Sequence, residues 1–230
     1  MDFTPDDLRK VAVFEHAPNE DLMLILGSSI ARSVEEGAYF FFQGDAADYL
    51  YILTAGQVKL LQSNAAGQQV NLRTIYPGQM FGALGAVRDK ANYPAAAQAL
   101  EDSTALAIRS SLLKQMMESR PYLSAGFMQL MTSYIQEMQA RFRELATERV
   151  QQRIARSLLR LASQSGQKAA DGIELALSRQ DFAEISGTTL YTVSRVLTDW
   201  DRQGLIIAGR EHIRILQPHG LVRIAEGLEE

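Results

Sequence analysis

Residues 177–216 read LSRQDFAEISGTTLYTVSRVLTDWDRQGLIIAGREHIRIL, and this stretch decides how the C-terminal part of the chain folds. Ser178 stands three positions before Asp181, and a serine oxygen there can accept a backbone N–H at a helix start, as in a capping box. We therefore expect a short helix over residues 179–186. Gly187 then permits a sharp turn.

A second helix is predicted directly after this turn. Thr188 or Thr189 can cap its start. The residues expected on its buried face are Val193, Val196, Leu197 and Trp200. Two short helices joined by a tight glycine turn are typical of a helix-turn-helix. The runs GLIIAG and REHIRIL follow as strand candidates around residues 208–211, which predicts a β-wing.

The opposite face of this second helix carries groups that suit DNA. A helix N-terminus in the major groove offers hydroxyl and N–H groups to phosphates, and an arginine can donate two hydrogen bonds to guanine. The candidate DNA-binding residues of the helix and the wing are Thr188, Thr189, Leu190, Tyr191, Ser194, Arg195 and Arg210. On an isolated helix Arg195 would be a solvated charge, but the capped first helix, the turn and the wing together favour DNA binding.

The charge distribution agrees with this interpretation. The whole chain has a net charge of −4, and residues 1–118 hold nine basic and fourteen acidic side chains. Residues 147–225 hold eleven basic and eight acidic side chains. An acidic front and a basic back indicate that only the C-terminal part meets a polyanion.

The composition excludes several classes of protein. Cysteine is absent, which rules out disulfides, thiolate zinc sites and thiolate-held iron–sulfur clusters. His16, His212 and His219 lack a metal-ligand spacing, so no metal site is expected, and a β-roll enzyme would need a His and carboxylate cluster. No apolar run approaches the ~20 residues of a membrane span, and the acidic N-terminus does not resemble a secretory signal. We expect a cytoplasmic protein that is not an enzyme.

Short apolar stretches punctuated by glycine extend from about Val34 to Ile108, with glycines 7 to 12 residues apart. Strands at that spacing indicate an all-β sandwich or barrel. Tyr49–Thr54 and Val58–Gln62 are expected to pair as a hairpin. Two short helices, residues 6–14 and 19–28, are expected before the strands.

A long helix is predicted from Pro121 to Ala146, where apolar residues recur at intervals of three and four. It either packs along its own domain or forms a parallel coiled-coil dimer. We favour the dimer because the helix separates two regions that each look complete, although the spacing is not strictly heptad. The expected dimer interface consists of Phe127, Leu130, Met131, Tyr134, Met138, Phe142 and Leu145.

The segment that follows is expected to begin the C-terminal domain. Residues 149–163, RVQQRIARSLLRLAS, predict an amphipathic helix. Residues 163–172, SQSGQKAADG, are expected to be a polar loop, and ELALS at 174–178 is a strand candidate.

Three stretches have a recognisable pattern: FFQGDAADYLYILTAGQVKLL (41–61), PGQMFGALG (77–85) and LSRQDFAEISGTTLYTVSRVL (177–197). Through them the chain, over about residues 10–217, resembles the cyclic-AMP receptor and fumarate–nitrate regulator (Crp-Fnr) superfamily of bacterial transcription factors. The resemblance implies an α+β fold with an eight-stranded, cyclic-nucleotide-binding-like β-roll (jelly roll), a long dimerisation helix and a winged helix-turn-helix. It also implies a homodimer on a two-fold DNA operator and contact with RNA polymerase.

The resemblance also places domain boundaries and further DNA contacts. We expect a sensor roll with short N-terminal helices at 1–118, the dimerisation helix at 119–146 and the DNA-binding domain at 147–230. Residues that stand where family members touch the DNA backbone are Ser178, Arg179 and Gln180.

The family pattern is broken where the second helix reads bases. Ser194 and Arg195 match it, but Tyr191 stands at the position of a base-reading glutamate, after Leu190. A carboxylate accepts from cytosine N4 or adenine N6, whereas a tyrosine stacks, contacts a thymine methyl or donates to phosphate. The half-site preference therefore cannot be copied from the better-known relatives.

The anchors of the cyclic-nucleotide members are also missing. Those members hold the ligand with a Gly-Glu-Leu motif and an Arg-Ser pair, but residues 82–85 are Gly-Ala-Leu-Gly, and Tyr93-Pro94 stand near the Arg-Ser position. A buried phosphate without its arginine is costly. Cyclic AMP is therefore not the expected effector. A cyclic-nucleotide-responsive regulator with an altered pocket is the alternative, and a module that regulates a partner protein would need the same anchors.

Residues 91–100, ANYPAAAQAL, resemble the cysteine-free, nitric-oxide-responsive branch of dissimilatory nitrate respiration regulators, which can use haem. An apolar pocket between roll and helix could admit a porphyrin, or the same residues could be ordinary packing. The cofactor is thus unknown, with haem as a hypothesis and an iron–sulfur cluster excluded. The expected effector-pocket residues are Gly82, Ala83, Leu84, Tyr93, Pro94, Met131, Tyr134 and Met138. The effector, the operator and the choice between activation and repression stay open.

Overall fold

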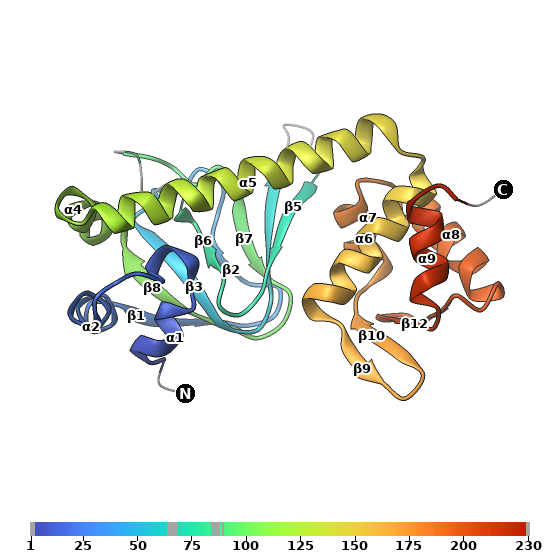
Figure 1. The fold of residues 1–230 in the computed structure, drawn as a ribbon, viewed down its shortest axis with the longest axis horizontal. Helices are drawn as coiled ribbons and strands as arrows, with labels where there is room; N and C mark the ends of the chain where they lie inside the picture. Colours follow the sequence, from blue (N-terminus) through green and yellow to red (C-terminus); the bar gives the residue numbers. More distant parts are fainter. Residues whose placement is uncertain (1–2, 64–68, 84–87, 89, 229–230) are drawn as a thin grey trace. The chain divides into compact units, whose positions relative to one another are not determined.

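A computed structural model describes residues 3–63, 69–83, 88 and 90–228 of the chain. The residues divide into two units, Met1–Glu137 and Met138–Glu230, and the boundary falls inside the longest helix, α5 (Pro121–Thr147). Figure 1 shows the strands of the first unit in blue to green and the second unit in yellow to red. The long helix agrees with the prediction for residues 121–146.

The first unit contains two antiparallel sheets of four strands each. One sheet has the order β1 (Ile30–Val34), β8 (Ser103–Arg109), β3 (Tyr49–Ala55) and β6 (Met80–Phe81). The other has the order β2 (Tyr39–Phe41), β7 (Ala96–Ala99), β4 (Val58–Ser63) and β5 (Gln69–Ile75). The eight strands confirm the predicted roll.

Strand β3 is buried on both faces, because its side chains alternate between two cores. Tyr51 and Leu53 pack with residues of the opposite sheet, whereas Leu50 and Ile52 pack against helices. Among the described residues, the helices of the first unit are α1 (Pro5–Arg9), the 3-10 helix η1 (Ala12–Phe14), α2 (Asn19–Gly27), α4 (Ser110–Ser119) and the first part of α5. The roll therefore has an aromatic interior and a helical cover on one sheet.

The predicted hairpin of residues 49–54 and 58–62 is wrong, although both strands exist. β3 pairs with β8 and β6, while β4 pairs with β5 and β7, so the two strands belong to different sheets. Gly56 forms the corner between them at φ +84°, and a Cβ there would lie 2.6 Å from the carbonyl oxygen of Asp102. The glycine thus serves a crossing between sheets rather than a hairpin turn.

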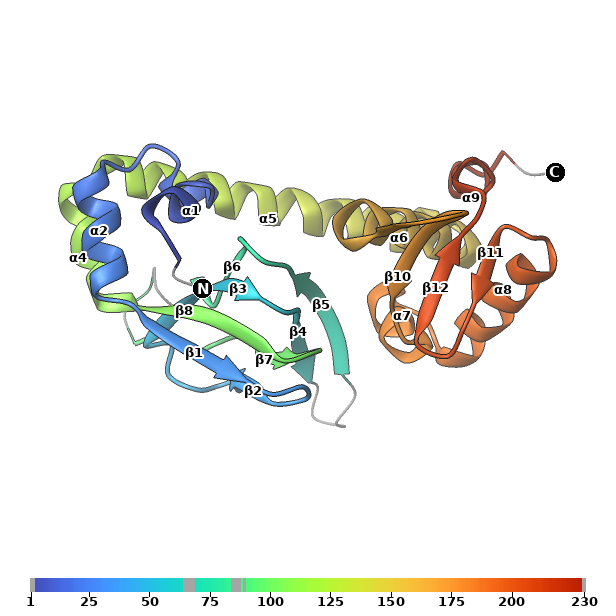
Figure 2. The same ribbon diagram turned by 90° about the horizontal axis from the view of Figure 1, so that it is seen from below.

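The second unit is a helical domain with one small sheet. Its elements are the end of α5, α6 (Val150–Ser165), β9 (Gln167–Ala169), β10 (Gly172–Ala176), α7 (Arg179–Ser186), α8 (Leu190–Arg202), β11 (Ile206–Ala208), β12 (His212–Ile215) and α9 (Pro218–Ala225). The sheet order is β11-β12-β10-β9, and Figure 2 shows β10, β12 and β11 side by side. A single core joins α6, α7, α8 and α9 to this sheet.

Part of the predicted polar loop at 163–172 is strand. Residues 167–169 form β9, which pairs with β10 through the register Gly172↔Ala169. On the other side of β10, Gly172 allows the close approach of β12, because a Cβ there would lie 2.1 Å from the carbonyl oxygen of Ile215. The sequence of residues 163–172 predicts a turn, but it does not predict β9, because a three-residue polar strand shows no alternation of apolar residues.

Candidate nucleic-acid interface

The start of α7 is fixed by its serine cap. Ser178 Oγ accepts the backbone N–H of Asp181 at 3.0 Å and also donates to the Asp181 carboxylate. Arg179 Nη2 donates to the carbonyl oxygen of Ala208 at 3.4 Å, which ties the helix start to strand β11. Gln180 is exposed and donates to Glu184. The three residues expected on the DNA backbone thus lie together at one rigid helix end.

The turn between α7 and α8 depends on Gly187. Its φ of +64° is left-handed, and its N–H donates to Ala183. Thr188 N also donates to the Ala183 carbonyl oxygen, at 3.0 Å. Thr189, rather than Thr188, is the cap of α8, since its hydroxyl accepts the N–H of Thr192 at 3.2 Å. The predicted helix-turn-helix is present with the expected caps.

Helix α8 separates its buried and exposed faces as the sequence predicts. The buried face is Val193, Val196, Leu197 and Trp200, each at most 3% exposed. On the opposite side Tyr191 is 76% exposed and Leu190 is 45% exposed. Arg195 is exposed and Ser194 is half-buried. The face predicted to read DNA therefore has free apolar, phenolic and guanidinium groups at the helix start.

The wing is a tight antiparallel pair. Gly209 N donates to the His212 carbonyl oxygen at 2.9 Å, and Arg210 is exposed in the turn between β11 and β12. Behind the wing, Arg214 pairs with Glu174 at 2.9 Å and with Asp171 at 3.2 Å. The hydrogen bond and charge of Glu174, followed by the charge of Asp171, raise the pKa of Arg214 above its usual value. The wing is thus held on its sheet and presents Arg210 to solvent.

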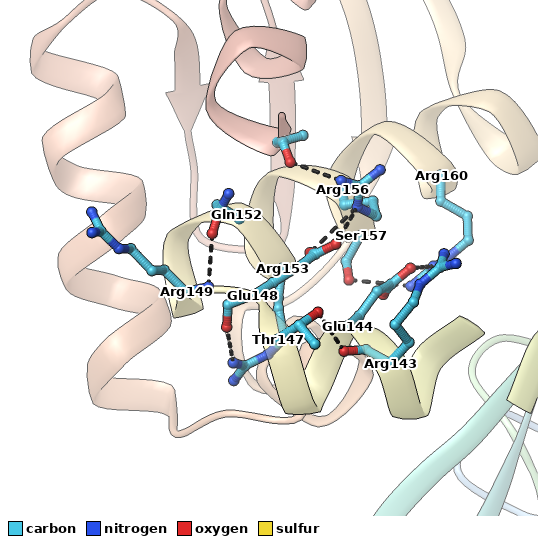
Figure 3. Close-up of polar contacts among 11 residues, drawn as sticks. Arg143, Glu144, Thr147, Glu148, Arg149, Gln152, Arg153, Arg156, Ser157 and Arg160 are labelled. Atoms are coloured by element: carbon cyan, nitrogen blue, oxygen red, sulfur yellow. Dashed lines mark hydrogen bonds and ion pairs between the residues drawn. The ribbon is translucent and has the colours of Figure 1, made fainter. Parts of the chain in front are cut away.

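The end of α5 is joined to α6 by ion pairs (Figure 3). Glu144 is buried, with its carboxylate 3.5 Å from Arg160 Nη1. Glu148 lies 3.2 Å from Arg156, whose Nη2 also donates to the Ala225 carbonyl oxygen at 2.8 Å. Arg156 therefore links the α5–α6 junction to the end of α9. The sequence does not reveal this cluster, because its members come from different elements: Glu144 from α5, Glu148 from the connection, and Arg156 and Arg160 from α6.

The residues predicted for the effector pocket are partly inside the roll. Tyr93 is buried, its ring stacks on Phe41 with centroids 3.6 Å apart, and its hydroxyl donates to the Tyr49 carbonyl oxygen. Burial raises the pKa of the Tyr93 phenol. A Cβ at Gly82 would lie 3.2 Å from the Tyr93 ring, and Ala83 is buried. Tyr93 thus fills space next to the segment where cyclic-nucleotide members carry their glutamate.

The remaining predicted pocket residues do not join this cluster. Pro94 is exposed, and Leu84 lies outside the described residues. Tyr134 donates to the Met80 carbonyl oxygen at 3.2 Å, and Met131 is half-buried. Met138 belongs to the second unit and is 71% exposed. The structure therefore brings Gly82 and Tyr93 together, places Ala83 in the separate core under the helices, and does not gather the full set.

A haem site does not fit the residues that the structure describes. His16 is exposed, and the hydroxyls of Tyr93 and Tyr134 already donate to backbone carbonyls. Within the described part of the chain, no group of three or more His, Cys, Asp or Glu residues could hold a metal ion. Across the same residues, no helix is both long enough and apolar enough to span a membrane.

The apolar residues of α5 fall into two sets. Phe127 is 3% exposed and lies in the first unit's own core, with Leu130 and Tyr134 half-buried beside that unit. The exposed set includes two residues that the sequence analysis did not name, Met128 (65%) and Ile135 (56%). Met138 and Phe142 were named and are 71% and 74% exposed, while the Leu145 side chain lies outside the description. Met128 and Ile135 could be predicted from their spacing, because they precede Phe142 at intervals of seven residues.

Comparisons with known proteins match both units. A cyclic nucleotide-binding domain family matches residues 31–120, and a Crp-like helix-turn-helix domain family matches residues 152–224. The transcriptional activator protein anr of Pseudomonas aeruginosa is 29% identical, over 85% of this chain and 80% of that protein. The cyclic AMP receptor protein of Thermus thermophilus is 27% identical, over 94% and 97%. The structure of FixK2 from Bradyrhizobium japonicum has the same fold, with a TM-score of 0.75 and 21% identity over 85% and 96%.

Together the two matched domains define a DNA-binding transcription regulator with a cyclic-nucleotide-binding-type roll. The chain belongs to the Crp/Fnr family. The relatives are transcription regulators, so the prediction that this protein is not an enzyme is confirmed. The predicted fold is also confirmed, whereas the comparisons do not single out the nitric-oxide-responsive branch.

Proposed function

We propose that this protein is a sequence-specific transcriptional activator that binds a two-fold DNA operator as a homodimer through the start of α8. The observation that carries the proposal is the exposed face of α8, where Tyr191 and Arg195 lie free beside the Thr189 cap. Ser178, Arg179 and Gln180 are proposed to hold the DNA backbone, and Arg210 of the wing to contact a flanking phosphate. The proposed location is the cytoplasm, where bacterial DNA lies.

The proposed dimer uses the exposed apolar positions of α5. Met128, Ile135 and Phe142 are seven residues apart, and Met131, Met138 and Leu145 are also seven apart. These two series are the a and d positions of a heptad repeat, which favours a coiled coil of two helices. The interface proposed here replaces Phe127, whose surface is already covered by its own unit, with Met128 and Ile135.

The relatives named as activators support activation for this chain, which would require contact with RNA polymerase.

The effector is a separate question. Cyclic AMP is not the proposed effector, because Ala83 is buried where a ribose-binding glutamate would stand and Tyr93 occupies the neighbouring space. Nitric oxide sensed through haem, the signal that the sequence resemblance implied, is not the proposed signal either, because the described residues do not fit a haem site. An unchanged haem absorption spectrum after mixing with the protein is the expected result, and a shifted Soret band would contradict it.

The experiment that tests the function is selection of the operator from random duplexes by the full-length protein. Two-fold symmetric binding should enrich inverted half-sites with centres about 34 Å apart or a multiple of it. Ser194→Ala/Arg195→Ala protein should enrich no such motif. Enrichment of the same motif by this variant would reject α8 as the reading helix, and no enrichment by the wild type would reject sequence-specific binding.

A further inference from the structure

The sensor unit has one concentration of positive charge that the proposed function does not use. A pocket of about 660 Å³ is lined by Arg88, Lys90, Arg109 and Lys114 and, among the residues that the structure describes, by one acidic residue, Asp48. Residues 1–118 hold only nine basic side chains against fourteen acidic ones. Four of the nine therefore line this single pocket in an otherwise acidic part of the protein.

The pocket is built on a fixed backbone. Its floor is the segment of residues 46–49, which is bonded to walls on both sides. On one side Ala47 N donates to the Ala91 carbonyl oxygen at 2.9 Å. On the other side Ser110 N donates to the Asp48 carbonyl oxygen at 2.8 Å, and Ser110 Oγ donates to the Ala47 carbonyl oxygen at 2.7 Å. Ala91 and Ser110, one from each wall, are thus bonded to residues 47 and 48.

Within the described part of the chain, two of the four basic side chains of this pocket are unpaired, whereas Lys114 does have an interaction partner. Among the residues that the structure describes, Arg88 and Lys90 have no hydrogen bond or ion pair, and Arg109 contacts the Tyr49 ring at 5.7 Å. By contrast, other basic residues of the unit are engaged: Arg9 donates to Ala17 and Asn19, and Arg73 pairs with Glu137. Like charges gathered in one cleft repel one another and attract an anion, and low-dielectric walls strengthen both effects.

The chemistry of the lining points to phosphate. Guanidinium groups bind phosphate oxygens bidentately, and ammonium groups bind them as point charges. The hydroxyl of Ser111 and the amide of Asn92 add neutral groups to the same lining. Ala46, Ala47 and Ala91 offer a small apolar wall, and the volume lies within the ~300–1,000 Å³ range of small-molecule sites.

We propose that this pocket binds a small phosphate-bearing anion of nucleotide size, such as a nucleoside diphosphate. The site differs from the roll interior, because neither Gly82, Ala83 nor Tyr93 lines it. It would make the sensor unit responsive to a phosphorylated metabolite although the cyclic-nucleotide anchors are absent. The proposal does not depend on the operator or on the dimer.

The test is calorimetric titration of the full-length protein, without DNA, with inorganic pyrophosphate and with adenosine 5′-diphosphate. We expect saturable binding of one anion per chain. Arg88→Gln/Lys90→Gln changes two exposed side chains and should weaken binding at least about tenfold, since each charge-assisted hydrogen bond contributes that much. Tighter binding of the nucleotide than of pyrophosphate would show that the apolar wall contributes.

The matched control is Lys10→Gln/Arg202→Gln, which removes two charges from side chains that are 75% and 77% exposed outside the pocket. It should bind like the wild type. Equal weakening in both double variants would overturn the proposal, because it would show general electrostatic attraction. Loss of binding in Arg195→Gln would place the anion on the DNA-reading helix and would also overturn it. If neither anion binds saturably to the wild type, the pocket is not a phosphate site.

Discussion

Tyr191 is the residue that most distinguishes this reading helix. It lies in the first turn of α8 and is 76% exposed, so its ring and hydroxyl are free to meet a base edge. Because tyrosine cannot accept two hydrogen bonds as a carboxylate does, it favours stacking or a thymine methyl contact. Under the proposed function, this side chain is expected to set the specificity at one base pair of each half-site.

Tyr191→Glu is expected to change the sequence preference rather than the fold. A carboxylate in this position accepts from cytosine N4, so the enriched half-site should shift at one base pair, with discrimination of about 1–3 kcal/mol. Operator selection with the variant measures the shift. Tyr191→Phe is the control, since it keeps the ring. An unchanged motif in the glutamate variant would show that Tyr191 makes no base contact.

Gly187→Ala is expected to destabilise the DNA-binding unit by about 1 kcal/mol, because alanine is strained at φ +64°. Urea unfolding followed by the fluorescence of Trp200, the only tryptophan, reports on this unit. Gly27→Ala is the control, since no atom lies within 4 Å of its added Cβ and its φ is not left-handed. Equal midpoints for Gly187→Ala and the wild type would contradict the assigned turn.

At the scale of elements, the buried ion pairs make the last part of α5 a component of the DNA-binding unit. Glu144 and Arg160 have side chains that are 10% and 25% exposed, and Arg160 also donates to Ser157. A buried carboxylate needs such partners, because its desolvation is otherwise uncompensated. The end of α5 is therefore held against α6 by charge.

Glu144→Gln should lower the stability of the second unit by about 1 kcal/mol, since it leaves Arg160 with a weaker partner in a mostly buried place. The urea midpoint of tryptophan fluorescence measures the change. Asp199→Asn is the control, because its pair with Arg202 is exposed and 3.8 Å long. A variant Glu144→Gln as stable as Asp199→Asn would show that the pair does not hold α5 in place.

Sequence reasoning performed best where local chemistry decides the element. The caps at Ser178 and Thr189 and the glycine turn between them could be read directly, because each depends on residues at most three or four positions apart. It failed for the pairing of β3, since the partner strand β8 lies about fifty residues further along the chain. It also failed for the ion pair between Glu144 and Arg160, because Arg160 lies on the next helix.

At the scale of the whole molecule, one helix packs on the first unit and is proposed to form the dimer as well. The apolar residues of α5 that face the first unit's core, such as Phe127, obscured the heptad formed by Met128, Ile135 and Phe142. Interval counting cannot separate two overlapping stripes, whereas burial separates them at once. The residues around the sensor cavities are harder to predict from sequence. Neither the filling of the roll interior by Tyr93 nor the pocket lined by Arg109 has a sequence signature.

Ile135→Arg is expected to convert the dimer to a monomer, because it places a charge in the proposed apolar seam. Sedimentation velocity measures the mass in solution. Gln136→Arg is the control, since this exposed neighbour is not at an a or d position. A dimer that persists in Ile135→Arg would reject the α5 interface.

The central claim, that α8 reads DNA, is tested most directly by fluorescence anisotropy of the full-length protein on its selected operator. The account predicts that Ser194→Ala/Arg195→Ala weakens binding at least about tenfold. It also predicts that Ser163→Ala/Arg202→Ala, on exposed positions elsewhere, stays within about twofold of the wild type. Equal affinity of the first variant and the wild type, at the same salt concentration, would contradict the account.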